Sequence, residues 1–276
     1  MQFTDMNNTS LIFDSHAHYT SPQFAEDLPQ LLDSLPQQGV DGVVECGVDF
    51  ASSKASIDLA ERWDYIYAAV GIHPECLIDP ESSTTKQFAG DWQAELDAIA
   101  QLLDHPKVVA VGECGLDYHW PVPKEAQLAM FEAHLKLAVE RDIPIIVHDR
   151  KAHADVYELL RRYQPKGVVH CFSGSAEDAV QLAKQGMYLG FGGAVTFQGA
   201  KRAVKAVCAV PLEYLVLETD CPYMAPVPCR GQRCDSSLIA HTAQFIAQQR
   251  GMDSEELLKI TNQNARRLFG LPALSL

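Results

Sequence analysis

Two histidines stand one residue apart near the start of the chain, in the stretch FDSHAH at positions 13–18. Because side chains alternate faces along a strand, His16 and His18 would point the same way, as two ligands of one metal ion must. Imidazole nitrogens bind zinc, manganese and related divalent ions. The alternative is two ordinary strand-end histidines held by hydrogen bonds, and this fragment by itself leaves both interpretations open.

More histidines and carboxylates follow short apolar runs further along the chain. They are His73 in GIHP, Glu113 in VGECGLD, His148 in IIVHDR, His170 in VVHCFSG, and Glu218 and Asp220 in LETD. A separate structural role for each of these histidines is a weaker explanation than one shared metal site. Two ions about 3.5–4 Å apart need a bridging group, and a carboxylate such as Glu113 has two oxygens to share. The expected ligands are His16, His18 and Asp220 for one ion, and His148 and His170 for the other.

Eight short apolar runs predict the strands that would position these residues. The runs cover residues 11–17, 41–48, 65–71, 107–113, 143–148, 167–171, 187–191 and 213–219. Segments with helical periodicity lie between them, such as 124–142. Buried strands that alternate with helices predict a parallel α/β protein, and eight such units close a (β/α)8 TIM barrel. The functional residues of such a barrel lie at the C-terminal ends of its strands, where these histidines and carboxylates fall.

A doubly wound open sheet is the alternative architecture. It would carry a glycine-rich phosphate-binding loop after the first strand, but this chain has DSHAHYT there. No low-complexity linker or block of charge divides the sequence. We therefore expect residues 1–276 to form a single domain.

The composition limits the class of protein and its partners. A net charge of -14 argues against tight, sequence-independent binding of long duplex nucleic acid, although a metal ion can still hold one phosphate in an acidic protein. Eight irregularly spaced cysteines are not a secreted disulfide framework, and we expect them to be reduced. No apolar run or leader of secretory type is present, so we expect a cytoplasmic enzyme with no membrane contact. Nothing predicts a protein partner.

Several separated motifs together resemble one family. DSHAH, GIHP, GECGLDY, VHDR, HCFSG and ETDCPYMAP follow one another between residues 14 and 226. In this order they resemble the TatD family of metal-dependent deoxyribonucleases, within the amidohydrolase superfamily of (β/α)8 barrels. RGQR at 230–233 and the closing NQNARRLFG extend the resemblance over nearly the whole chain.

The resemblance implies a role for each matching residue. It implies that His16, His18 and Asp220 hold the first metal, that Glu113 bridges, and that His148 and His170 hold the second. His73 matches a position beside the scissile phosphate, and Asp220 is also placed to handle a proton. The expected catalytic residues are Asp220, Glu113 and His73.

Substrate contacts are less specific in the sequence. Arg150 and Arg230 would bind substrate phosphate, as His73 would, or the two arginines form salt bridges that shape loops; both interpretations stay open. Asp149 adds a negative charge beside His148, but strand alternation would turn it away from that face. The segment CRGQRCDSS departs from the family pattern after RGxR, and it borders the predicted cleft.

These observations predict a hydrolase that uses two divalent ions, Mg²⁺, Mn²⁺ or Zn²⁺. A water activated by the ions would cleave phosphodiester bonds of DNA, from an end or in a single strand. One alternative keeps the site but hydrolyses a small amide, ester or phosphoester. Another is a non-catalytic scaffold protein, against which the complete ligand set argues.

Overall fold

The structure of the chain is a computed structural model that describes residues 11–273. Its strands form one parallel sheet, in which each strand pairs with the next one along the chain. The strands are β1 (Ile12–Ala17), β2 (Val40–Cys46), β3 (Ile66–Val70), β4 (Val108–Asp117), β5 (Ile145–Arg150), β6 (Gly167–Val169), β7 (Met187–Phe191) and β8 (Leu215–Leu217). The helices are α1 (Leu28–Ser34), α2 (Phe50–Arg62), α3 (Ser83–Lys86), α4 (Trp92–Leu102), α5 (Lys124–Glu140), α6 (His153–Tyr163), α7 (Ala176–Lys184), α8 (Lys201–Ala209), α9 (Ile239–Arg250) and α10 (Ser254–Leu268).

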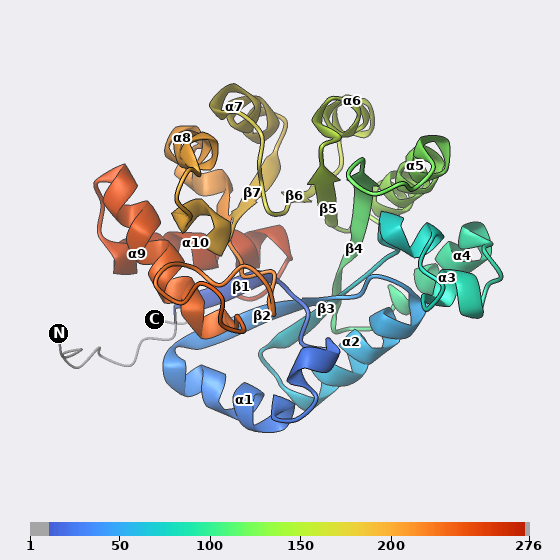
Figure 1. The fold of residues 1–276 in the computed structure, drawn as a ribbon, viewed down its shortest axis with the longest axis horizontal. Coiled ribbons are helices and arrows are strands. Elements are labelled where there is room, and N and C mark those ends of the chain that lie inside the picture. Colours follow the sequence, from blue (N-terminus) through green and yellow to red (C-terminus); the bar gives the residue numbers. More distant parts are fainter. Residues whose placement is uncertain (1–10, 274–276) are drawn as a thin grey trace.

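The two edge strands of the sheet meet, and the sheet closes into a barrel. Asp220 N donates to His16 O at 2.9 Å, and His18 N donates to Cys221 O at 3.0 Å. Below this junction the buried Asp14 carboxylate accepts hydrogen bonds from the amide and the hydroxyl of Thr219. Figure 1 shows the helices standing around the strands. The predicted (β/α)8 barrel is confirmed.

Each predicted strand matches an observed one, with differences at the ends. β4 continues to Asp117, beyond its predicted end at 113, because residues 114–117 keep pairing with β5. Gly115 permits this close pairing: its φ is +150°, and a Cβ there would lie 2.0 Å from the carbonyl oxygen of His148. β8 is shorter than predicted, since only residues 215–217 pair as a strand.

One end of the barrel is closed by packing. Apolar side chains that point into the barrel, among them Phe13 and Ile146, form a buried cluster with Leu268 and Phe269 at the end of α10. Asn262 of α10 donates to the carbonyl of Leu11, which fixes the helix under the sheet. Because α10 covers this end, the C-terminal ends of the strands form the open end.

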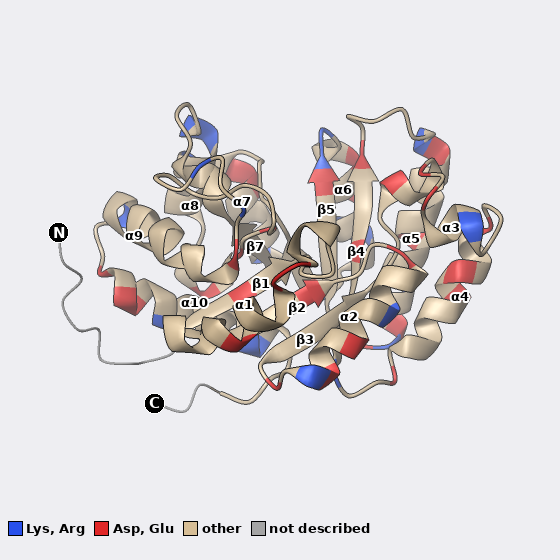
Figure 2. Cartoon of the chain, turned by 60° about the horizontal axis from the view of Figure 1, so that its bottom comes forward, with Lys and Arg blue, Asp and Glu red and all other residues tan. Residues whose placement is uncertain are grey.

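The surface carries charges of both signs, and the cysteines do not pair with one another. Figure 2 shows basic positions scattered among acidic ones, with no continuous basic band in this view. All eight cysteines lie within the described residues and are free thiols. Across residues 11–273, none of the helices combines the length and the apolar character needed to span a bilayer.

Candidate metal centre and active-site cleft

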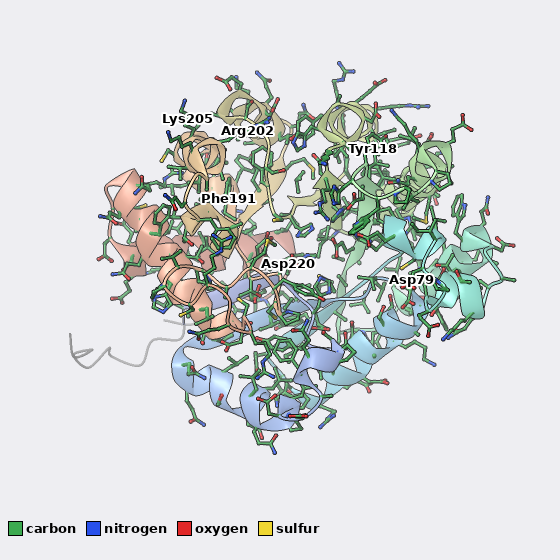
Figure 3. The ribbon with its side chains drawn as sticks, in the orientation of Figure 1. Asp79, Tyr118, Phe191, Arg202, Lys205 and Asp220 are labelled. Atoms are coloured by element: carbon green, nitrogen blue, oxygen red, sulfur yellow. The ribbon has the colours of Figure 1, made fainter. Side chains whose placement is uncertain are left out.

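The predicted site residues come together at the open end of the barrel. A cleft of about 940 Å³ lies there, and its lining includes His18, His73, Glu113, His148, His170 and Asp220. His16 lies directly behind them and is fully buried. Figure 3 shows Asp220 at the middle of the molecule, inside the ring of helices. These side chains lie in strands of the sheet or within three residues after them, and six different strands contribute, so the sheet itself holds them together.

Glu113 lies at the centre of the group, and its two carboxylate oxygens face different histidines. The Nε2 atoms of His16 and His18 both lie 3.4 Å from Oε2. On the other side, His148 Nδ1 and His170 Nε2 both lie 2.9 Å from Oε1. This is the division into two sets, joined by one carboxylate, that the sequence predicts.

The remaining two predicted residues lie on opposite sides of this carboxylate. Asp220 Oδ1 is 3.4 Å from His18 Nε2 and 3.7 Å from His16 Nε2. His73 Nε2 is 3.7 Å from Glu113 Oε1. His73 comes after β3, where it caps a short 3-10 helix at Pro74–Leu77.

The donor atoms fit divalent metal ions. Three groups of three ligand atoms each lie within 4.8 Å of one another: His16, His18 and Asp220; His16, Glu113 and His170; and His73, Glu113 and His148. The Nε2 atoms of His16 and His18 lie only 3.0 Å apart and are directed at the same space. Mixed imidazole and carboxylate donors suit zinc, manganese and similar ions.

The electrostatics of the site divide its histidines into two kinds. Burial lowers the pKa of His16 to about 4 and that of His73 to about 3, so both imidazoles are neutral near pH 7. His16 keeps a lone pair for a ligand, whereas His73 Nδ1 accepts a hydrogen bond from Glu75 N and leaves the proton on Nε2. Burial opposes the charge of Glu113, but the surrounding histidines outweigh it and hold its pKa well below the usual range.

Burial also opposes the charge of His18, His148 and His170, but the neighbouring carboxylates outweigh it and raise the pKa of each imidazole, that of His148 to about 10. A metal ion that binds these three histidines must therefore displace their protons.

Other groups hold the outer nitrogens of the histidines. Asp117 Oδ2 lies 3.0 Å from His148 Nε2, so the aspartate orients that ring. Cys46 contacts both rings of the first pair: its carbonyl lies 3.0 Å from His18 Nδ1 and its Sγ 3.4 Å from His16 Nδ1. The sequence analysis missed Cys46, because a contact between β1 and β2 leaves no local motif.

The buried carboxylate of Glu218 lies beside the last histidine of the group. Its Oε1 accepts a hydrogen bond from Cys171 N and lies 3.8 Å from His170 Nδ1. Neither His170 Nδ1 nor Glu218 Oε2 has a hydrogen-bond partner among the described residues. Burial raises the pKa of Glu218 to about 8.

The two arginines expected to contact substrate lie in different places. Arg150 lines the cleft, with its guanidinium 5.9 Å from the centre of the Trp120 ring. Arg230 is not among the cleft residues, and its guanidinium lies 4.3 Å from the centre of the Phe197 ring. Asp149 points away from the cleft, as predicted, and its carboxylate lies 2.7 Å from His153 Nδ1.

Comparison with known proteins decides the family. A family model described as TatD related DNase matches residues 13–270. The chain belongs to the TatD family. An uncharacterized metal-dependent hydrolase, YabD of Bacillus subtilis, is 40% identical over 94% of this chain and 99% of its own length. The 3'-5' ssDNA/RNA exonuclease TatD of Citrobacter rodentium is 32% identical over 94% of this chain and 98% of its own length.

Solved structures agree with this assignment. The crystal structure of YJJV, a TatD homolog from Escherichia coli K12, superposes with a TM-score of 0.85 at 30% identity, covering 95% of this chain and 99% of that one. The resemblance read from the separated motifs is therefore confirmed. As a member of the TatD family, the chain is a metal-dependent hydrolase that acts on ester bonds.

Proposed function

We propose that the chain is a deoxyribonuclease that removes nucleotides from the 3' end of single-stranded DNA, with two divalent ions at the centre of the cleft. The observation that carries the proposal is Glu113, whose two carboxylate oxygens face two separate pairs of imidazoles. A carboxylate between two ligand sets is suited to hold two ions close together, and paired ions act in many enzymes that cleave phosphodiesters.

In this proposal, different residues of the chain bind the metal ions, accept the proton and bind the phosphate. His16, His18 and Asp220 would hold one ion and His148 and His170 the other, and Glu113, whose oxygens face both sets, would contribute to each. When bound, such ions lower the pKa of a water molecule and neutralise charge on the phosphate. Asp220 faces the cleft, so its carboxylate accepts the proton that the attacking water loses. His73 and Arg150 donate hydrogen bonds to the oxygens of the scissile phosphate.

The substrate and its polarity rest on the relatives and on the charge of the cleft. Homologues at about 32% identity carry the name 3'-5' ssDNA/RNA exonuclease, which supports both the single strand and the direction. Arg150 is the single lysine or arginine in the described lining of the cleft. One cation cannot grip a long duplex, so a short single-stranded end suits this site better.

A small ester or amide is the second candidate substrate, and one observation favours it. Glu75 and Asp79 line the cleft in addition to the central carboxylates, and they repel a polyanion. Replacing Glu75 by Gln therefore separates the candidates. The change lowers KM for an oligonucleotide and leaves KM for a neutral ester unchanged.

The direct test is a cleavage assay with the metal-loaded protein. Single-stranded oligonucleotides labelled at the 5' or the 3' end are incubated with Mg²⁺, Mn²⁺ or Zn²⁺, alongside a panel of small esters. Progressive shortening from the 3' end, abolished by chelator and by Asp220→Asn, supports the proposal. Cleavage of the esters alone overturns the nuclease assignment, and shortening from the 5' end overturns the polarity.

A further inference from the structure

The mouth of the cleft exposes apolar side chains that the metal centre does not use. Among residues 11–273, the exposed large hydrophobic side chains are Ile78 (44%), Trp120 (44%), Val139 (47%), Tyr223 (56%) and Val227 (48%). Ile78, Trp120 and Tyr223 all line the cleft. Within this part of the chain, Trp120 and Tyr223 are also the two exposed aromatic residues. Exposed apolar groups that gather at one site mark a binding surface.

The two aromatic side chains approach the cleft from opposite sides. Trp120 follows β4 and Tyr223 follows β8, and these strands lie across from each other in a sheet ordered β1 to β8 that closes into a barrel. The metal centre therefore lies between two exposed aromatic groups.

The charge of the lining indicates how such a cleft would bind a nucleic acid. Glu75 and Asp79 add negative charge, and Arg150 supplies the one guanidinium among the described lining residues. Binding through phosphates needs several cations, because its strength comes from released counterions. Stacking of a base on an aromatic ring needs none, and it contributes about 5- to 150-fold in affinity per base.

We propose that Trp120 and Tyr223 stack against the bases that flank the scissile phosphate, and that this stacking selects unpaired nucleotides. The inference rests on the proposed nuclease function. A base inside a duplex is already stacked on both faces, so it offers no free face to either ring. The choice of a single strand is thus made at the rim of the cleft and not at the metals.

The test compares the cleavage of a DNA strand that carries bases with the cleavage of one that lacks them near its 3' end. The substrates are an oligothymidylate and the same oligonucleotide with abasic tetrahydrofuran units at the three nucleotides nearest its 3' end. The wild-type protein has a KM about 5- to 150-fold lower for the base-bearing substrate, with similar kcat. Trp120→Ala and Tyr223→Ala each reduce this preference, whereas Trp120→Phe and Tyr223→Phe keep most of it. Val227→Ala is the matched control, since Val227 is equally exposed in the same loop but does not line the cleft.

The outcomes separate the stacking proposal from the nuclease function. Equal KM values for both substrates, or an unchanged preference in both alanine variants, overturn stacking while the nuclease function stands. If no oligonucleotide is cleaved, the nuclease assignment fails, and tryptophan fluorescence decides about stacking alone. Quenching by oligothymidylate that is lost in Trp120→Phe and with the abasic strand supports stacking, and the lack of quenching in the wild-type protein overturns it.

Discussion

The floor and the rim of the cleft are built from opposite kinds of residue. The floor consists of titratable groups, each of which has a nitrogen or oxygen atom within 3.7 Å of another member. We define it as His16, His18, His73, Glu113, His148, His170 and Asp220. The rim, defined as Ile78, Trp120, Arg150 and Tyr223, consists of large side chains that reach into solvent. Glu113 is only 4% exposed, whereas Tyr223 is 56% exposed.

This difference follows from the elements that carry the two regions. Floor residues lie in strands or directly after them, and backbone pairing with neighbouring strands fixes their positions. Rim residues lie mostly in the loops that follow, where a side chain can change without disturbing the sheet. The comparison assigns the chemistry to the floor and the choice of substrate to the rim. Substitutions in the two regions should therefore change different quantities.

The largest effect is expected at the centre of the floor. Glu113→Gln removes the charge that faces both pairs of imidazoles, so we expect kcat to fall on the order of 10³-fold or more, together with the bound metal content. Glu75→Gln is the matched control, because it removes the same charge from the lining of the same cleft and keeps the backbone N–H through which Glu75 contacts His73. Steady-state kinetics and metal analysis measure both changes. Full activity in Glu113→Gln would contradict the assignment of the chemical step to the residues of the floor.

A smaller loss is expected from a residue that acts through the floor. His148 donates hydrogen bonds to two carboxylates, from Nε2 to Asp117 and from Nδ1 to Glu113. When a metal ion replaces the proton on Nδ1, Asp117 would keep the other proton on Nε2. In Asp117→Asn, an amide that donates to Nε2 would put the proton on Nδ1 instead, and a protonated nitrogen cannot bind a metal. We expect metal affinity and kcat to fall about 10- to 100-fold, measured by metal titration and by the oligonucleotide assay. If only KM changed, Asp117 would belong functionally with the rim.

The sequence predicts the floor well because the chemistry and the strand ends coincide there. His16 and His18 lie at the end of an apolar run, and the barrel topology brings that run to the same edge as His148 and His170. Parallel strands leave little freedom in where such residues meet. The motif order also carries the family resemblance, which the comparisons confirm.

Contacts between strands and the conformations of loops could not be predicted from the sequence. Cys46 supports His16 across two neighbouring strands, and neither residue signals the other locally. Trp120 and Tyr223 resemble any other aromatic residues until the fold shows that they stay exposed beside one cleft. Arg150 and Arg230 were equal candidates for phosphate binding, and the structure distinguishes them because one lines the cleft and the other lies over Phe197.

Removing a tyrosine hydroxyl at a buried site and at the rim compares the contributions of the two regions to stability. Tyr19 is fully buried just below the floor, and its hydroxyl accepts a hydrogen bond from Ser236 N at 2.8 Å. Tyr19→Phe leaves that buried N–H unpaired, so we expect the free energy of unfolding to fall by about 1–3 kcal/mol. Tyr223→Phe, at the rim, should change it by less than about 0.5 kcal/mol. Urea denaturation of chelator-treated protein measures the free energy of unfolding of both variants without a contribution from bound metal. Equal decreases in Tyr19→Phe and Tyr223→Phe would contradict the difference between the buried position and the rim.

The smallest expected effect concerns the one cation of the rim. A single guanidinium that binds one phosphate gives a slope of about -0.7 in a plot of log affinity against log salt concentration for a single strand. Arg150→Ala should remove that slope, so that a fourfold rise in salt no longer raises KM by roughly threefold. Arg230→Ala is the matched control, because Arg230 lies outside the cleft lining. KM measured between 50 and 200 mM salt with all three proteins tests this. A slope several times steeper in the wild-type protein would mean that phosphate contacts elsewhere on the surface hold the strand, and the rim would then lose its role as the region that selects the substrate.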